Sequence, residues 1–219
     1  MKILLFGATG MIGQGVLREC LLNAEVERVL SVVRSATWPR QAKVREVVHS
    51  NFQDFSALQT QLGEIDACLF CLGVASAGMT EEAYRLVTHD YTIAAARACL
   101  EANPAIAFLY ISGAAADSSE QGRIMWARVK GQTENDLLKM LFRRVHLFRP
   151  GFIRPLHGIQ SRTKLYRVLY RVLGPLMPAL QALFPRAVTT TEQLGRAMLR
   201  VAKDGYEKPI LEMRDITRF

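Results

Sequence analysis

The chain has 219 residues, of which half are hydrophobic and 22% are charged. This length and composition are typical of one globular domain with a sizeable core, and they argue against a disordered chain. The net charge is +8 but unevenly spread, because residues 1–140 hold 13 Lys or Arg against 15 Asp or Glu, whereas residues 141–219 hold 15 against 5.

The sequence predicts neither a membrane span nor a metal site. No stretch of about 18 uninterrupted apolar residues occurs, and the apolar run in MKILLFGATG is too short for a signal peptide, so we expect a cytoplasmic protein. Four cysteines, at positions 20, 68, 71 and 99, are expected to be reduced thiols. Cys68 and Cys71 form a CxxC within a predicted strand, where positions three apart point to opposite faces and cannot share a metal.

The first 150 residues alternate between short β-rich runs and helical patterns. Strands are predicted at 2–6, 28–33, 43–48, 66–71, 107–111 and 145–148. Helices are predicted at 12–23, 56–62, 80–102 and 123–141. This alternation predicts an α/β fold with a doubly wound parallel sheet.

The pattern changes after Pro150. A loop is followed by helical segments up to about residue 184, interrupted at Gly174 and Pro175. A last helix is predicted between Thr190, whose spacing from Gln193 suits a capping box, and Gly205. We therefore expect a first α/β domain at 1–151 and a small, mainly helical cap lobe at 152–219, whose last helix and strand pack back on the first domain.

A glycine-rich turn follows the first predicted strand. GATGMIG places Gly7, Gly10 and Gly13 at intervals of three residues, where the strand gives way to a helix. Glycine is needed where backbone turns tightly or approaches a pyrophosphate, and the helix N-terminus then offers N–H groups and a favourable dipole to the anion. In this context the motif predicts a dinucleotide site rather than a simple turn.

The preferred dinucleotide is predicted from the end of the second strand. Arg34 lies there, with no Asp or Glu to accept from a ribose 2′-hydroxyl, and an arginine suits a 2′-phosphate. We therefore favour NADP(H) over NAD(H), the alternative being a solvated arginine at a strand end. Asp54 follows the third strand, where it either approaches the adenine amino group or caps the helix that begins near Ser56.

Several motifs follow one another in the order found in a known superfamily. They are GATGMIG at 7–13, Asp54-Phe55, FCLG at 70–73, YISG at 110–113, an aromatic-x-x-x-Lys at 126–130 and FRPGFI at 148–153. On these motifs the chain resembles the atypical short-chain dehydrogenases/reductases, in particular the oxidoreductase-like branch that includes the Tat-interacting protein. It is also similar to epimerase/dehydratase-type domains. The resemblance implies a Rossmann fold with strand order 3-2-1-4-5-6.

The resemblance further implies that a nicotinamide dinucleotide lies across the carboxyl ends of the strands. Gly73 and its neighbours would follow the fourth strand beside the cofactor, Ser112 and Gly113 would end the fifth, and the loop from Pro150 would border the nicotinamide. With the residues above, the expected cofactor-binding set is Gly7, Thr9, Gly10, Met11, Ile12, Gly13, Arg34, Asp54, Phe55, Cys71, Leu72, Gly73, Ser112, Lys130, Pro150, Gly151, Phe152 and Ile153.

The catalytic half departs from the family. In the family, a Tyr and a Lys four residues apart on a helix act together, because the lysine binds the nicotinamide ribose and lowers the tyrosine pKa from about 10, so that the tyrosine exchanges a proton with a carbonyl or alcohol. Lys130 is present, but Trp126 replaces the tyrosine, and an indole N–H does not titrate. Ser112 lies one or two positions before the usual Ser or Thr, where Gly113 or Ala114 stands.

Three interpretations of this pair remain open. Lys130 clamps the ribose while Trp126 packs on the nicotinamide or covers the substrate, with little or no chemistry. Alternatively another group supplies the proton, the candidates being Tyr91, His89, His157 or a bound water. In the third interpretation Lys130 points to solvent on an ordinary helix. The candidate catalytic residues are therefore Lys130, Trp126, Ser112 and Tyr91.

The basic charge is concentrated in one segment. No acidic residue lies between Asp136 and Glu192, and residues 162–184 place apolar side chains at helical spacing with Lys and Arg around them. We expect a helix that caps the substrate cleft, where its arginines would favour an anionic or phosphate-bearing ligand. An interfacial helix on anionic lipid, or a contact with a partner or second subunit, is the alternative. No nucleic-acid partner is expected, because no sequence-reading motif accompanies the charge.

Two classes of function follow from these observations. The first is an NADP-dependent oxidoreductase of unidentified substrate with an unconventional proton donor. The second is a catalytically weak or inactive dinucleotide-binding protein that regulates or assembles with a partner. Trp126 favours the second class, whereas the closed apolar cleft implied by residues 152–185 favours the first.

Overall fold

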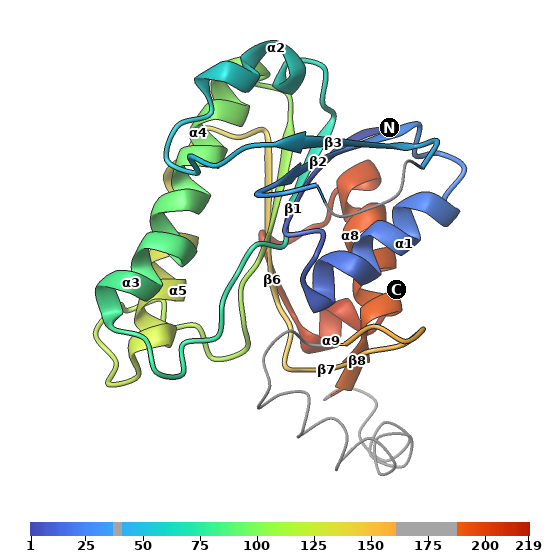
Figure 1. The fold of residues 1–219 in the computed structure, drawn as a ribbon. Coiled ribbons are helices and arrows are strands. Elements are labelled where there is room, and N and C mark those ends of the chain that lie inside the picture. The colour runs from blue at the N-terminus through green and yellow to red at the C-terminus, as the bar shows by residue number, and fades with distance from the viewer. Residues whose placement is uncertain (37–40, 161–187) are drawn as a thin grey trace.

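The computed structural model describes residues 1–36, 41–160 and 188–219. Its centre is a seven-stranded sheet in which every neighbouring pair of strands is parallel (Figure 1). In spatial order the strands are β3 (Val44–Val48), β2 (Arg28–Val33), β1 (Lys2–Phe6), β4 (Ala67–Phe70), β5 (Ala107–Ile111), β6 (Arg144–Arg149) and β9 (Ile210–Glu212). The predicted doubly wound sheet is confirmed, and β9 extends the implied order 3-2-1-4-5-6 at one edge.

Helices lie on both faces of the sheet. They are α1 (Met11–Leu22), a 3-10 turn (Ser56–Leu58), α2 (Gln59–Leu62), α3 (Glu81–Arg85), a π-helical segment (Leu86–Asp90), α4 (Tyr91–Ala102), α5 (Met125–Lys139), α8 (Thr191–Asp204) and α9 (Met213–Ile216). The four helices predicted before residue 142 are confirmed to within about two residues at most ends, as is usual for helix boundaries. The last helix is also confirmed, with the Thr190 side chain accepting from the backbone N–H of Gln193.

Two hydrophobic layers enclose the sheet. On one face, Ile3 and Leu5 of β1 pack with residues of α1 and α8. On the other, Leu4 and Phe6 of β1 pack with residues of α2, α4 and α5. Alternate residues of a strand point to opposite faces, so the nearly continuous apolar runs of β1, β4 and β5 are the expected pattern for strands covered on both sides.

Residues 188–219, the described part of the chain after the gap, pack against residues 1–151. Strand β9 pairs with β6, and α8 lies beside α1 (Figure 1). A second, two-stranded parallel sheet joins β7 (Phe152–Arg154) to β8 (Val188–Thr190). The predicted helices and basic stripe at 162–184 lie outside the described residues, so the expected division at residue 151 and the cap stay predictions.

The four cysteines are free thiols. Cys68 lies in β4 and Cys71 just after it, and burial raises the pKa of both thiols. Burial likewise raises the pKa of Cys20 to about 12. Within the described ranges no cluster of metal-ligating side chains is found, and no helix is long and apolar enough to cross a membrane.

Candidate functional site

The glycine turn between β1 and α1 is built by close backbone contacts. Gly7 has φ +77, and a Cβ there would lie 2.6 Å from backbone atoms of Cys71 and Leu72. A Cβ on Gly13 would lie 2.0 Å from the carbonyl oxygen of Gly7. Glycine is needed at both positions, because the Gly7 contact holds the turn against the end of β4 and the Gly13 contact folds the turn closely on itself.

The middle glycine of the motif, Gly10, has a different environment from Gly7 and Gly13. Gly10 is the N-cap of α1, with φ −79, and among the described residues an added Cβ would have one neighbour within 4 Å, the Gly7 carbonyl oxygen at 3.3 Å. The first turn of α1 carries no acidic residue and no side-chain cap. The N–H groups of a 12-residue helix therefore point at the space above Gly10, which is the arrangement that binds a phosphate.

A cleft of about 700 Å³ lies above this turn. Its lining residues come from the turn, the ends of β2, β3 and β4, and the start of α4: Gly7, Thr9, Gly10, Met11, Arg34, Ser50, Phe52, Cys71, Leu72, Gly73, Val74, Ala75, Ala77, Val87 and Tyr91. A hollow of about 100 Å³ adjoins it and shares Gly7, Thr9, Arg34, Phe52 and Leu72. The structure thus brings together most of the predicted cofactor residues from the first four strands. Both remaining members of the turn, Ile12 and Gly13, pack beneath it.

One end of the cleft differs from the expectation for Asp54 and Phe55. Oδ1 of Asp54 accepts a hydrogen bond from the backbone N–H of Ser56 at 2.9 Å, so this side chain closes a turn just before the 3-10 segment, whose N-cap residue is Phe55. Phe55 is 2% exposed and packs edge-on against Phe6 in the core. Phe52 lines the cleft instead. The sequence places all three residues after the third strand, and only the course of the loop decides which one faces the ligand.

Two side chains flank this end. Arg34, exposed at the end of β2, lines both the cleft and the adjoining hollow. The ring of Tyr91 lies 5.7 Å from that of Phe52. Tyr91 therefore lines the cleft beside Phe52.

The Lys130 side chain is buried at the end of β5. Its Nζ donates hydrogen bonds to Oη of Tyr110 and to the carbonyl oxygen of Ile111, each at 2.9 Å. Burial lowers the pKa of Lys130 to about 8, and Glu134, one helical turn further along α5, acts in the opposite direction. The interpretation in which Lys130 points to solvent is wrong, because the residue is 9% exposed.

Trp126 and Ser112 lie next to the same strand end. Cζ3 of Trp126 would be 3.6 Å from a Cβ on Gly113, so the indole covers the residue that follows Ser112. The Ser112 hydroxyl is buried and has no hydrogen-bond partner within the described part of the chain. A buried hydroxyl without a partner is costly, and a ligand at the end of β5 would satisfy it.

The other proton-donor candidates lie elsewhere. His89 is hydrogen-bonded through Nδ1 to Asp90 at 2.7 Å and through Nε2 to Asp136 at 2.9 Å, between the π-helical segment and α5. His157 is exposed and bonds to Glu192 of α8 at 2.7 Å. Both imidazoles have carboxylate partners outside the cleft, so neither is placed to serve a ligand above Gly10.

The loop after β6 lies beside the loop after β5. The carbonyl oxygen of Pro150 accepts from the backbone N–H of Ala114 at 2.9 Å. Gly151 is exposed, Phe152 is half-buried and Ile153 packs in the core. This loop lies beside the end of β5, although its residues are not among those that line the 700 Å³ cleft.

A buried ion pair fixes α5 against β6. Arg149 donates to Glu134, whose side chain is 1% exposed, and also to Oγ of Ser118 at 2.8 Å and Glu212 at 3.2 Å. The pairing of Arg149 thus joins α5, β6 and β9 beside the candidate catalytic residues.

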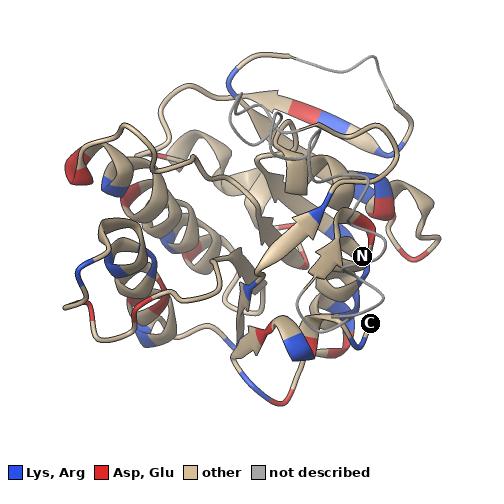
Figure 2. Ribbon diagram, turned by 90° about the horizontal axis from the view of Figure 1, so that it is seen from below, with Lys and Arg blue, Asp and Glu red and all other residues tan. Residues whose placement is uncertain are grey.

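Figure 2 looks onto the carboxyl edge of the sheet and shows acidic and basic residues intermixed on the described helices.

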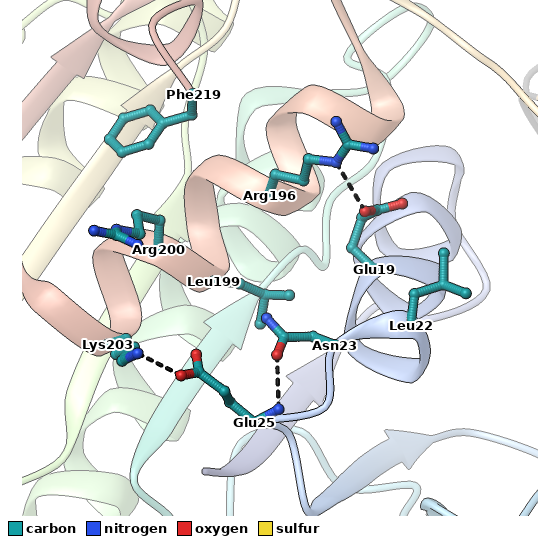
Figure 3. Close-up of a pocket in the computed structure, with 9 residues that line it drawn as sticks. All are labelled: Glu19, Leu22, Asn23, Glu25, Arg196, Leu199, Arg200, Lys203 and Phe219. Atoms are coloured by element: carbon teal, nitrogen blue, oxygen red, sulfur yellow. Dashed lines mark hydrogen bonds and ion pairs between the residues drawn. The ribbon is translucent and has the colours of Figure 1, made fainter.

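A second hollow, of about 490 Å³, lies between α1 and α8, away from the glycine turn (Figure 3). Glu19 pairs with Arg196 at 3.3 Å and Glu25 with Lys203 at 2.5 Å across it. Two of its charge pairs thus lie within the hollow, Arg200 pairs with Asp204 outside it, and none of its lining residues is a predicted site residue.

The sequence reasoning missed several lining residues. Ser50, Phe52 and the apolar loop after Gly73 carry no motif of their own. Tyr110 belongs to the YISG motif, but nothing in the sequence indicates that its hydroxyl meets Lys130, 20 residues away. A signal existed only for Phe52, which is the first aromatic residue after the third strand.

The cleft and the strand order allow comparison with known proteins. No known family profile matches the chain. An oxidoreductase of the short-chain dehydrogenase/reductase family from Burkholderia thailandensis has a similar structure, with a TM-score of 0.70 over 98% of this chain and 91% of its own, at 18% identity. The fold is that of the short-chain dehydrogenases/reductases. Gre2 from Candida albicans, solved with NADPH, also has this fold, with a TM-score of 0.70 over 97% of this chain and 77% of its own, at 14% identity.

The curated sequence relatives are fungal. The FMP52 protein of Eremothecium gossypii is 30% identical over 155 residues, which are 70% of this chain and 66% of its own length, just under two thirds. These relatives are named mitochondrial proteins, which contradicts the expected cytoplasmic location. That expectation rested on the short apolar run at the N-terminus, which addresses secretion and carries no information on mitochondrial import.

Proposed function

We propose that the protein binds NADP(H) and acts as an oxidoreductase on a carbonyl or alcohol substrate. The observation that carries the proposal is the open cradle at Gly10, where a helix N-terminus without acidic residues faces a cleft of about 700 Å³. The dehydrogenase/reductase fold supports it, since proteins with this fold include one solved with NADPH.

The residues present fit a nicotinamide dinucleotide. Gly10 leaves the backbone bare where a pyrophosphate would lie, and Gly7 and Gly13 allow the tight turn beneath it. Phe52 offers a ring beside an adenine, and the Ser112 hydroxyl, beside the end of β5, has no partner among the described residues. When bound, the nicotinamide supplies or accepts a hydride. Every other task falls to side chains of the chain.

NADP(H) is favoured over NAD(H) by one side chain. Arg34 lines the cleft at the end of β2, where a ribose 2′-phosphate would lie, and a guanidinium donates two parallel hydrogen bonds to a phosphate. The carboxylate that would accept from a free 2′-hydroxyl is missing at this strand end.

Three residues would carry out the protein's part of the reaction: Ser112 just after β5, and Lys130 and Trp126 of α5, whose side chains lie near the end of β5. Among the described residues Lys130 makes two hydrogen bonds through Nζ, which leaves its third N–H for a ribose hydroxyl. The Ser112 hydroxyl is available to the oxygen of a carbonyl substrate. Trp126 covers Gly113 and excludes water, but it donates no proton, so the proton comes from another group or from water.

The alternative function is a dinucleotide-binding protein with little or no chemistry. Trp126 favours it, because the acid of the family's Tyr–Lys pair is absent. Both functions need the cofactor, so the proposal separates into a binding claim and a catalytic claim that are tested in turn.

Nicotinamide fluorescence tests the binding claim. Cofactor-stripped protein is titrated with NADPH and, in parallel, with NADH, and at least tenfold tighter NADPH binding is expected, which corresponds to about 1.4 kcal/mol. Arg34→Ala is the matched variant, and it should lose the preference while keeping NADH binding. Failure of both cofactors to bind would refute the proposal. Equal binding would refute only the role of Arg34. Turnover of NADPH with a panel of small aldehydes and ketones then tests the catalytic claim.

The proposal also includes a branch of the superfamily and a location in the cell. The order of the FCLG and FRPGFI motifs supports the branch that includes the Tat-interacting protein. The names of the fungal relatives support a mitochondrial location, which fractionation of cells that express the tagged chain tests.

A further inference from the structure

The lysine that the family pairs with a helix tyrosine has a tyrosine partner on a strand here. Oη of Tyr110, in β5, lies 2.9 Å from Nζ of Lys130, and the ammonium also lies 4.7 Å from the centre of the Tyr110 ring. The position one helical turn before Lys130 is Trp126, whose indole lies over Gly113. A phenol oxygen therefore meets the lysine from within the sheet, although the helix offers none.

We propose that Tyr110 is a positioning residue that fixes the Lys130 ammonium at the cofactor edge of β5. This inference rests on the proposed function, because the group that Lys130 serves is the nicotinamide ribose. Tyr110 touches no ligand itself and acts only through Lys130.

The geometry supports a holding role rather than a proton-transfer role. Tyr110 is fully buried, and burial raises the pKa of its phenol, so the hydroxyl stays neutral and its oxygen accepts from the ammonium. The Ile111 carbonyl oxygen accepts a second N–H at the same distance. With two donors held by consecutive residues of one strand, the direction of the third N–H is set by β5.

A long side chain that is held by fewer hydrogen bonds does not keep its head group in one direction. A lysine has four rotatable bonds and a compact ammonium, so a single hydrogen bond leaves its head free to swing. A family member with a tyrosine on the helix has a second group beside the lysine in the site. This chain has tryptophan there, which neither accepts a proton nor offers an oxygen, so the strand tyrosine is the described side chain whose oxygen holds the ammonium.

The pH dependence of NADPH binding depends on the charged and titratable groups that lie near the Lys130 ammonium. Besides Tyr110, Glu134 of α5 acts on Lys130 and is itself paired with Arg149 of β6. Tyr84 of α3 acts on Tyr110. Since Glu134 and Arg149 compensate each other, removal of the Tyr110 oxygen is expected to change mainly the proton affinity of Lys130.

A double-mutant cycle tests the proposal. NADPH dissociation constants are measured for the wild type, Tyr110→Phe, Lys130→Met and the double variant, since the cycle isolates the coupling of the two side chains. We expect Tyr110→Phe to weaken NADPH binding about threefold to tenfold in the wild type and less than about twofold in the Lys130→Met background. Tyr206→Phe is the control, because it removes a hydroxyl that bonds to Asp215 at 3.2 Å, at a site remote from the cleft.

A pH series supplies a readout that a purely structural role would not move. Without the Tyr110 oxygen the charged form of Lys130 is less favoured, so the alkaline midpoint of NADPH binding should fall in Tyr110→Phe and stay unchanged in Tyr206→Phe. If Tyr110→Phe does not fold, site-specific 3-fluorotyrosine at position 110 weakens the acceptor while keeping its shape, and a smaller shift in the same direction is expected.

The outcomes separate this inference from the proposed function. If the wild type binds no NADPH, the proposed function fails and the inference fails with it. If the wild type binds NADPH but Tyr110→Phe binds it equally well, or loses as much affinity in the Lys130→Met background, the inference alone is overturned.

Discussion

Replacing Gly10 by alanine separates the ligand-binding role of the glycine turn from its structural role. At Gly10 the backbone has φ −79, which alanine adopts without strain, and within the described part of the chain the added Cβ meets only the Gly7 carbonyl oxygen, at 3.3 Å. Alanine is a poorer N-cap than glycine, so the free energy of unfolding should fall by about 0.5–1 kcal/mol. The methyl group would stand where a pyrophosphate needs bare backbone, and NADPH binding should weaken at least tenfold, by about 1.4 kcal/mol.

Gly13→Ala is the matched comparison within the same turn. Its Cβ would lie 2.0 Å from the Gly7 oxygen, 1 Å inside the 3.0 Å limit for such contacts, so the backbone of the turn must move. Alanine gains about 1 kcal/mol in helix propensity over glycine, but overpacking of this severity costs about 3 kcal/mol or more. Gly13→Ala should therefore lose stability and binding together, whereas Gly10→Ala should lose binding with only the small N-cap loss of stability.

Urea unfolding and the NADPH titration measure the two quantities on the same preparations. The reasoning is refuted if Gly10→Ala binds NADPH within about twofold of the wild type, because the pyrophosphate then does not pass over Gly10. It is also refuted if Gly10→Ala is as unstable as Gly13→Ala, because the contacts at the two positions would then not decide stability.

Further predictions concern the candidate catalytic residues and their support. Trp126→Tyr should gain NADPH-dependent reduction of small aldehydes, because it restores a phenol one turn before Lys130, whereas Trp126→Phe should not; no gain with NADPH binding intact would mean that Lys130 is not placed for the family's chemistry. Arg149→Met should lower the free energy of unfolding by about 3–5 kcal/mol, since it leaves the buried Glu134 carboxylate unpaired, and adding Glu134→Leu should recover much of the loss; a loss below about 1 kcal/mol would contradict this. The pKa of Lys130 is lowered from 10.5 to about 8, so between these values the unfolded chain binds more protons and the wild type should gain stability as pH rises. Lys130→Met should lack this rise of stability with pH. If the unfolding free energies of the wild type and of Lys130→Met change with pH in parallel, the lowered pKa of Lys130 is refuted.

Features that depend on neighbours in the sequence were predictable. The strand, the glycine turn and helix α1 are encoded within residues 2–22, because hydrophobic period, turn chemistry and helix start all act over a few positions. The same holds for the alternation that predicts a parallel sheet. Lys130 was found because its distance from Trp126 is one helical turn.

Features that depend on where a loop runs were not predictable. Asp54, Phe55 and Phe52 follow the same strand. Asp54 closes a turn, Phe55 packs against Phe6 in the core, and Phe52 packs against Tyr91 in the cleft. A pattern in sequence records which residues are polar or apolar. It does not record which way a loop residue faces.

The sequence by itself determined the doubly wound sheet and the glycine turn, since both arise from local propensity and from spacing along the chain. Tertiary structure alone decided the partners of the candidate catalytic residues. His89 lies between Asp90 and Asp136, and Lys130 meets Tyr110 across 20 residues of sequence. Burial and hydrogen bonding between distant segments exist only after the chain has folded, and these set the environment in which a lysine or histidine acts.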